Sequence, residues 1–177
     1  NVADDVAVSI RLPLPDKAAA LALLEGILMG TYSVKGKKSQ GKLESVNLEV
    51  DFDISESDFA QVKVIADAVA LARDLAVRPA NQLYPEVFAS LVLDATQGSQ
   101  IEVEVLDEKQ LENQGYGLIS AVGMGSTRPP RLVRLRYKPA QAQKHLALVG
   151  KGITFDTGGL AVKPLSGMLG MKYDMSG

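Results

Sequence analysis

Apolar and polar residues alternate along this chain with two different periods, which predict strands and helices. Every second residue is apolar, as in a strand with one buried face, in four stretches: residues 6–12, 48–54, 101–105 and 133–137. Two signals predict helices: apolar residues that recur every three or four positions, and a capping residue at the start of a segment. The predicted helices cover residues 17–29, 59–77, 87–95 and 108–113. Residues 146–149 are apolar without interruption, which is typical of a strand buried on both faces. In the stretch at 133–137 the apolar residues are expected to face inward and the arginines outward: Val133, Leu135 and Tyr137 against Arg134 and Arg136.

Local signals set the ends of the first two helices. Asp16 is an N-cap for the first, and Gly30 ends it. Ser55 and Asp58 are spaced as a capping-box-like pair at the start of the second. Pro79 disfavours helical geometry at the residue before it, so the second helix is expected to end there. Its roughly nineteen residues would span about 28 Å, enough to connect two small domains.

The order of the elements predicts the fold class. From residue 56 it runs helix, helix, strand, helix, strand, strand, which indicates an α/β fold with a mixed, largely parallel sheet and flanking helices. We place a domain boundary at about residue 55. Residues 1–55 are then expected to be the C-terminal part of a smaller α/β N-terminal domain, residues 56–78 a connecting helix, and residues 79–177 the first part of a second, incomplete domain.

The composition excludes several classes of site. The 177 residues contain no cysteine, which excludes disulfide scaffolds, cysteine-zinc sites and thiol nucleophiles. The single histidine, His145, leaves little material for a histidine metal site or a Ser-His-Asp triad, and we interpret it as a surface residue. A formal net charge of −2 provides no basic surface for nucleic acid or for a membrane, so neither partner is expected.

Hydropathy and the chain ends indicate where the protein resides and how complete it is. No apolar run approaches the ~20 residues of a membrane span, and the N-terminus lacks a signal-peptide layout. We therefore expect a soluble, cytoplasmic protein. The chain begins without methionine and stops just after a group of charged residues, so we interpret it as an internal piece of a longer protein.

Four glycine-containing stretches are candidates for nucleotide-binding loops. Residues 35–42 are basic, but no strand-to-helix frame surrounds them, so a solvated loop is favoured over a phosphate site. Residues 115–125 contain Gly-Tyr-Gly without the third glycine of a dinucleotide fingerprint, and apolar residues follow where a helix should begin. Neither residues 150–152 nor residues 170–173 match the Walker loop.

Charged residues follow the apolar run at residues 146–149. They are two lysines and two aspartates, Lys151, Asp156, Lys163 and Asp174. In open α/β sheets, ligands gather at the carboxyl ends of strands, and charges near a core require partners. Lysine–aspartate pairs are nevertheless usually surface salt bridges worth ~0–1 kcal/mol. On the residue types alone, both a polar loop and a chemical site remain open.

The spacing of these residues is long and particular. Residues 149–164 read Val-Gly-Lys-Gly-Ile-Thr-Phe-Asp-Thr-Gly-Gly-Leu-Ala-Val-Lys-Pro, and residues 171–177 read Met-Lys-Tyr-Asp-Met-Ser-Gly. This pattern resembles the dizinc leucyl aminopeptidase (cytosol aminopeptidase) family. Residues 81–85 and 125–131, Asn-Gln-Leu-Tyr-Pro and Gly-Ser-Thr-Arg-Pro-Pro-Arg, are similar to landmarks of its catalytic domain. The likeness is good over residues 60–177 and only general before them.

The resemblance implies a role for each residue. The family binds two divalent cations, zinc or manganese, around a bridging carboxylate, which here would be Asp156, and Lys151 and Asp174 match the positions that complete one of the two metal sites. Lys163 matches a catalytic lysine that would polarise the scissile carbonyl and stabilise its oxyanion. Met171 matches a position in the pocket for the first side chain of a peptide substrate, so Met171, Lys163 and Asp156 are expected to contact substrate. The family releases N-terminal residues such as leucine from peptides and assembles as a hexamer.

The resemblance also implies what this chain lacks. In the family, two further acidic ligands and an arginine lie in a later Asn-Thr-Asp-Ala-Glu-Gly-Arg-like segment, which is absent from these 177 residues. Three of five expected metal-binding residues and one of two catalytic side chains are present, so the chain alone is expected to be inactive. The alternative is a non-catalytic binding module on the same fold. The presence of both lysines and both aspartates argues against it, because charges near a core are costly and a site without function does not need them.

Overall fold

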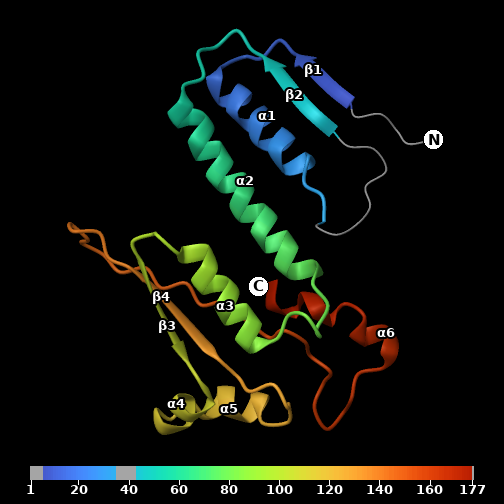
Figure 1. Ribbon diagram of the computed structural model, residues 1–177, viewed down its shortest axis with the longest axis vertical. Coiled ribbons are helices and arrows are strands. Elements are labelled where there is room, and N and C mark those ends of the chain that lie inside the picture. The colour runs from blue at the N-terminus through green and yellow to red at the C-terminus, as the bar shows by residue number, and fades with distance from the viewer. Residues whose placement is uncertain (1–5, 35–42, 177) are drawn as a thin grey trace. The chain divides into compact units, whose positions relative to one another are not determined.

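The structure of this chain is a computed structural model, and it describes residues 6–34 and 43–176. The chain divides into two compact units, Asn1–Val77 and Arg78–Gly177, and each is described by itself (Figure 1). The basic loop considered at residues 35–42 lies outside the described residues. Among the described helices, none combines the length and the apolar character needed to cross a membrane.

The first unit pairs two strands and two helices. Strands β1 (Val6–Arg11) and β2 (Leu43–Glu49) are parallel neighbours. Helices α1 (Lys17–Gly30) and α2 (Glu56–Val77) pack against each other, and the residues buried on them are small or β-branched: Ala20, Val62 and Ala66. Small buried side chains allow two helices to approach closely.

The second strand ends earlier than its alternating pattern predicts. Apolar residues continue to alternate as far as residue 54, and they are half-buried there, but β2 ends at Glu49. Glu49 is the partner of Arg11, the last residue of β1. The later residues therefore have no described strand beside them, and a strand at residues 48–54 is wrong in its bounds, although its face pattern is correct.

The helix signals in the first unit are confirmed. The side chain of Asp16 accepts the backbone N–H of Ala19 at 2.8 Å. The backbone N–H of Ser55 donates to Asp58 Oδ2 at 2.9 Å, and that of Asp58 donates to Ser55 Oγ at 3.2 Å, as in a capping box. Lys17 Nζ lies 2.6 Å from the same Asp58 Oδ2, so one carboxylate connects the starts of α1 and α2.

The C-terminal end of α1 is held by α2. Arg73 donates to the carbonyl oxygen of Met29 at 2.7 Å and lies over the ring of Tyr32, with 5.4 Å from Cζ to the ring centre. The hydroxyl of Tyr32 donates to Asp74 at 2.8 Å. A cation on the last carbonyls of a helix satisfies groups that have no partner within the helix.

The second unit combines helices with an antiparallel pair of strands. In chain order its elements are α3 (Pro85–Thr96), β3 (Ile101–Leu106), α4 (Glu108–Asn113), α5 (Gly117–Gly123), β4 (Leu132–Tyr137), α6 (Leu165–Met168) and the 3₁₀ helix η1 (Met171–Ser176). β3 pairs antiparallel with β4, and α3 packs against β3. Since one sheet is parallel and the other antiparallel, with helices packed beside them, the predicted mixed α/β class is confirmed.

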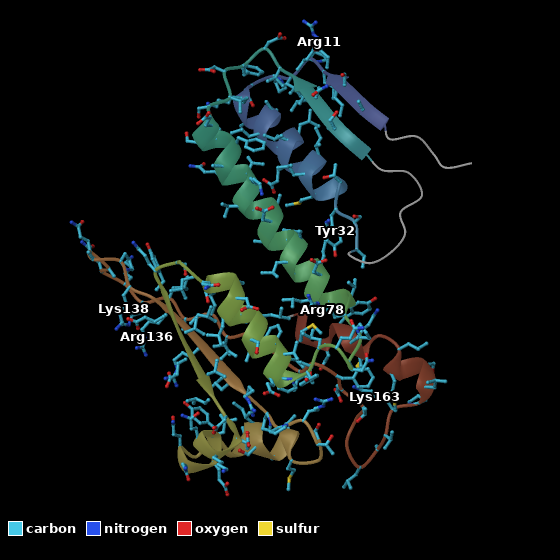
Figure 2. The ribbon with its side chains drawn as sticks, viewed as in Figure 1. Arg11, Tyr32, Arg78, Arg136, Lys138 and Lys163 are labelled. Carbon is cyan, nitrogen blue, oxygen red and sulfur yellow. The ribbon has the colours of Figure 1, made fainter. Side chains whose placement is uncertain are left out.

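The β3–β4 ribbon has one charged face. Glu102 lies opposite Arg136, and Glu104 lies opposite Arg134, with nitrogen–oxygen distances of 3.8 and 2.7 Å. Opposite charges in register support the pairing of two strands. On the other face, the prediction that Leu135 and Tyr137 point inward is wrong, because both are at least half exposed. Arg136, which lies between them, is exposed as well (Figure 2).

Two further predictions in the second unit are wrong. The apolar run at residues 146–149 is not a strand: Leu146, Leu148 and Val149 are between 86% and 98% exposed, and neither described sheet extends to it. A strand exists only beside a hydrogen-bonded neighbour. In the glycine-dense stretch, residues 117–123 form α5 where no helix was expected. Gly115, with φ of +77°, makes the sharp turn from α4 that allows the new helix.

Candidate active site

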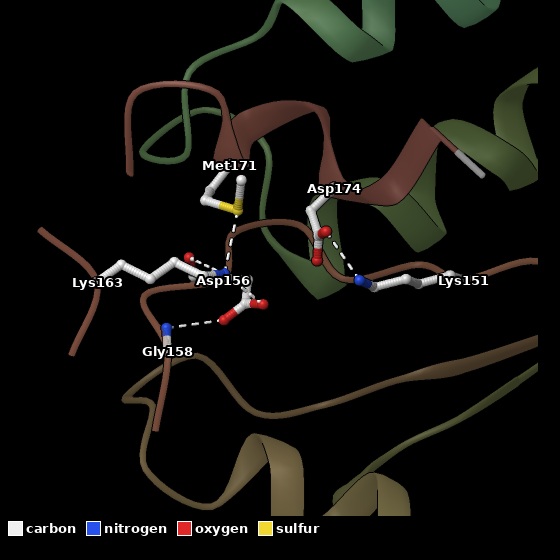
Figure 3. Close-up of polar contacts among 6 residues, drawn as sticks. All are labelled: Lys151, Asp156, Gly158, Lys163, Met171 and Asp174. Atoms are coloured by element: carbon white, nitrogen blue, oxygen red, sulfur yellow. Dashed lines mark hydrogen bonds and ion pairs between the residues drawn. The ribbon is translucent and has the colours of Figure 1, made fainter. Parts of the chain in front are cut away.

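The charged residues of the C-terminal segment form two ion pairs. Lys151 Nζ lies 2.8 Å from Asp174 Oδ1, and Lys163 Nζ lies 2.7 Å from Asp156 Oδ2 (Figure 3). All four residues singled out in the sequence are therefore brought together in pairs of opposite charge. His145, in contrast, is exposed, as predicted.

A tight turn brings Lys163 back to Asp156. The backbone N–H of Lys163 donates to the carbonyl oxygen of Thr157 at 2.9 Å, and that of Gly158 donates to Asp156 Oδ1 at 2.8 Å. Gly158 has φ of +93°, and a Cβ there would lie 2.5 Å from the carbonyl oxygen of Ala161. Only glycine fits this position, which explains the glycine after Asp-Thr in the sequence.

The 3₁₀ helix η1 contributes to both pairs. Residues three apart on a 3₁₀ helix lie on the same side, and Met171 and Asp174 have this spacing. Asp174 accepts from Lys151, and the sulfur of Met171 accepts a hydrogen bond from Lys163 Nζ at 3.2 Å. The predicted pocket residue Met171 is therefore in direct contact with the predicted catalytic lysine (Figure 3).

The electrostatics of the two pairs are connected. The pKa of Asp156 is lowered, first by the hydrogen bond from Lys163, then by the backbone N–H of Gly158, and also by the charges of Lys163 and Lys151. Because Lys151 acts on Asp156 as well as on Asp174, the two carboxylates lie in one positive field. Asp156 is thus kept ionised, the state in which a carboxylate binds a cation.

One carboxylate oxygen remains without a partner. The side chain of Asp174 is only 15% exposed, and its Oδ2 is buried and accepts no hydrogen bond from the described residues. A buried, unpaired charged oxygen is costly, so a simple surface salt bridge does not account for this residue. A cation beside Oδ2 would satisfy it.

These residues fit a divalent cation in part. Two carboxylates and an amine are oxygen and nitrogen donors suited to zinc or manganese, and Lys151 could serve only as the neutral amine. No group of three or more His, Cys, Asp or Glu side chains that could hold a metal occurs within residues 6–34 and 43–176. The described chain therefore provides some of a coordination shell and not all of it.

The two upstream landmarks also meet. The guanidinium of Arg128 lies over the ring of Tyr84, 3.9 Å from its centre, which joins residues 125–131 to the start of α3. A Cβ at Gly123 would lie 2.6 Å from the ring of Pro130, so the same loop also requires a glycine. Sequence reasoning missed both contacts, and it also missed the Met171–Lys163 contact, because each joins residues that share no periodic pattern.

Sequence comparison shows which known proteins this chain resembles. Residues 70–177 match the catalytic domain of the cytosol aminopeptidase family. The chain is 47% identical over 160 residues to a probable cytosol aminopeptidase of Corynebacterium diphtheriae, covering 87% of this chain and 32% of that protein. It is 40% identical over 188 residues to a probable cytosol aminopeptidase of Micrococcus luteus, covering 100% of this chain and 37% of that protein. The chain thus spans about a third of the length of the relatives it matches.

Solved structures of similar fold include two aminopeptidases and one maturation enzyme. A cytosol aminopeptidase of Coxiella burnetii is 29% identical with a TM-score of 0.82, over 96% of this chain and 36% of that one. A leucyl aminopeptidase of Trypanosoma cruzi is 30% identical with a TM-score of 0.81, over 99% and 35%. The bottromycin maturation enzyme BotP, solved in complex with Mn, is 33% identical with a TM-score of 0.77, over 96% and 37%.

Proposed function

Since the chain belongs to the cytosol aminopeptidase family, we propose that it supplies one part of the active site of a metal-dependent aminopeptidase. The reaction is release of N-terminal residues, with leucine-type preference, from peptides. The single observation that best supports this is Asp174: one oxygen is paired with Lys151, and the other is buried with no partner in the part of the chain that the structure describes.

Three of the four residues in the two ion pairs would hold the metals. Asp156 would bridge two divalent ions, zinc or manganese, while Lys151 and Asp174 would complete one of the two sites. A bridging carboxylate offsets the repulsion between two cations a few ångströms apart. When bound, the metal ions would supply an activated water and a point of attachment for the substrate's free amine.

Lys163 acts as the electrostatic catalyst in this proposal. Its side chain is 30% exposed, and its ammonium lies beside the proposed bridging carboxylate, where the scissile carbonyl would be held. A protonated lysine there stabilises the oxyanion of the tetrahedral intermediate, and one such donor is worth roughly 3–4 kcal/mol. Met171 offers an adaptable apolar surface for the first side chain of the substrate.

The remainder of the site lies outside these residues in our proposal. Two more acidic ligands and an arginine are needed, so the isolated chain is expected to show no turnover and at most weak metal binding. We further propose a cytoplasmic homo-hexamer as the complete form, by analogy with the family. A non-catalytic binding module on the same fold is the alternative, and no specific contact favours it.

A chimera tests the proposed function directly. The chain replaces the aligned residues of the Corynebacterium diphtheriae relative, to which it is 47% identical, and hydrolysis of a leucyl anilide is followed with manganese or zinc. We expect turnover by the chimera, a loss of at least about a hundredfold in Lys163→Gln, and no change in Lys109→Gln, an exposed lysine on α4. An inactive chimera that folds and assembles would refute the proposal.

A further inference from the structure

We propose that Met171 is a positioning residue for Lys163, and that its thioether orients the catalytic ammonium in addition to facing the substrate. The inference rests on the proposed function, because it assigns a role within that same site. It starts from one contact: Lys163 Nζ donates to Met171 Sδ at 3.2 Å.

The ammonium of Lys163 has as many acceptors as it has protons. A lysine carries three N–H donors and no acceptor. Its three acceptors here are Asp156 Oδ2 at 2.7 Å, the carbonyl oxygen of Asp156 at 3.3 Å and Met171 Sδ at 3.2 Å. The ammonium is therefore held from two sides, by the turn that begins at Asp156 and by η1 (Figure 3).

Two of these three acceptors belong to the residue proposed to bridge the metals. A metal ion on the carboxylate of Asp156 would compete with Lys163 for the carboxylate oxygens and weaken their hydrogen bond to its ammonium. The acceptors that the metal would not share are the main-chain carbonyl of Asp156 and the sulfur of Met171. Met171 would then be the side chain that keeps Lys163 in place during the reaction.

A sulfur acceptor suits this task better than an oxygen. Thioether sulfur is polarizable, uncharged and a weak acceptor, so it directs the ammonium without neutralising it. A carboxylate at the same place would compete with the developing oxyanion for the same charge. The position of the sulfur is also fixed, because Met171 is three residues from Asp174, which is itself held by Lys151.

Two substitutions separate positioning from simple pocket lining. Met171→Leu keeps an apolar side chain of similar volume and removes the acceptor. Met171→Gln restores an acceptor and makes the pocket more polar. If Met171 positions Lys163, the Gln variant should hold the Lys163 ammonium more firmly and be more active than the Leu variant. If Met171 only lines an apolar pocket, the Gln variant should be the less active of the two. Met124→Leu, at a methionine that is 82% exposed, is the matched control.

The first measurement uses the chain itself and requires no activity. The lysine ammonium groups are observed by ¹⁵N NMR, with Lys163 assigned from the signal lost in Lys163→Gln. We expect proton exchange of the Lys163 ammonium to accelerate about fivefold in Met171→Leu, to return toward the native rate in Met171→Gln, and to stay unchanged in Met124→Leu. Backbone amide signals of residues 156–163 verify that each variant folds. Equal exchange in the native chain and Met171→Leu, or no protected Lys163 signal at all, overturns the proposal.

The second measurement uses the active chimera. We expect Met171→Leu to lower kcat about fivefold with a smaller change in KM, and Met171→Gln to recover most of kcat. Activity of Met171→Gln at or below that of Met171→Leu overturns the positioning role. A chimera that is inactive with native residues refutes the proposed function instead, and the NMR comparison still decides the contact, so the two failures are distinguishable.

Discussion

Asp174 accepts a hydrogen bond from Lys151 through Oδ1 at 2.8 Å, and its Oδ2 is buried without a partner within residues 6–34 and 43–176. One carboxylate is thus half satisfied, at a position that is 15% exposed. Proteins of marginal stability rarely retain such a cost without a use for it. This unpaired oxygen is the feature that favours a metal site at the two ion pairs over simple salt bridges.

The unpaired oxygen predicts the effect of removing Asp174. In metal-free buffer, Asp174→Ala should change the free energy of unfolding by less than about 1 kcal/mol, because loss of the pair with half-exposed Lys151 is offset by removal of a buried, unsatisfied oxygen. Urea unfolding followed by circular dichroism measures this change. A loss of about 3 kcal/mol or more, as when a fully satisfied buried pair is broken, would contradict this interpretation of Asp174.

The turn at Gly158 predicts a large difference between neighbouring glycines. Gly158→Ala requires φ of +93° and brings a Cβ against the carbonyl oxygen of Ala161, so it should cost at least about 1–3 kcal/mol and separate Lys163 from Asp156. Gly159→Ala is the control, since a Cβ there meets nothing within 4 Å. Urea unfolding measures the loss of stability, and the Lys163 ammonium signal measures the separation of Lys163 from Asp156. If both variants lose the same stability and give the same ammonium signal, glycine is not required at position 158.

The pairing of Lys17 with Asp58 predicts how the first unit responds to acid. The pKa of Asp58 is lowered from 3.8 to about 2, first by the hydrogen bond from Lys17 and then by those from Ser55. A lowered carboxyl pKa contributes stability above the unfolded-state value, and this contribution is lost as pH falls from about 4 to about 2.

Acid titration of the helical signal tests this expectation. Asp58→Asn should remove part of the pH dependence between about 4 and 2, while Asp94→Asn, at an exposed position on α3, should leave it unchanged. Identical titration curves for the native chain and Asp58→Asn would show that the pair with Lys17 does not form in solution.

Local signals in the sequence predicted most of the described elements. Asp16 and the pair Ser55 and Asp58 cap their helices as expected, because a cap depends only on residues within one turn. α2 ends at Val77, before Arg78-Pro79, for a similar local reason. The failures lie where the outcome depends on a distant neighbour: the end of β2 follows from the length of β1, and residues 146–149 have no described strand beside them.

The residues of the candidate site could be predicted from the sequence, but the contacts between them could not. Lys151, Asp156, Lys163 and Asp174 were identified from their spacing, and the structure brings them together. The pairing of Lys151 with Asp174, 23 residues away, could not be predicted from local pattern. Nor could the contact of Met171 with Lys163, because it depends on the turn at Gly158 and on η1. Whether the domain boundary belongs at residue 55, with residues 56–78 as a connector, remains a proposal.

The metal content of the chimera with the Corynebacterium diphtheriae relative tests the central claim most directly. After equilibration with manganese or zinc and removal of free metal, we expect about two ions per chain, fewer in Asp156→Asn and in Asp174→Asn, and no change in Asp94→Asn. If the Asp156 and Asp174 variants retain as much metal as the native chimera, the two lysine–aspartate pairs are not part of a metal site, and the account is wrong.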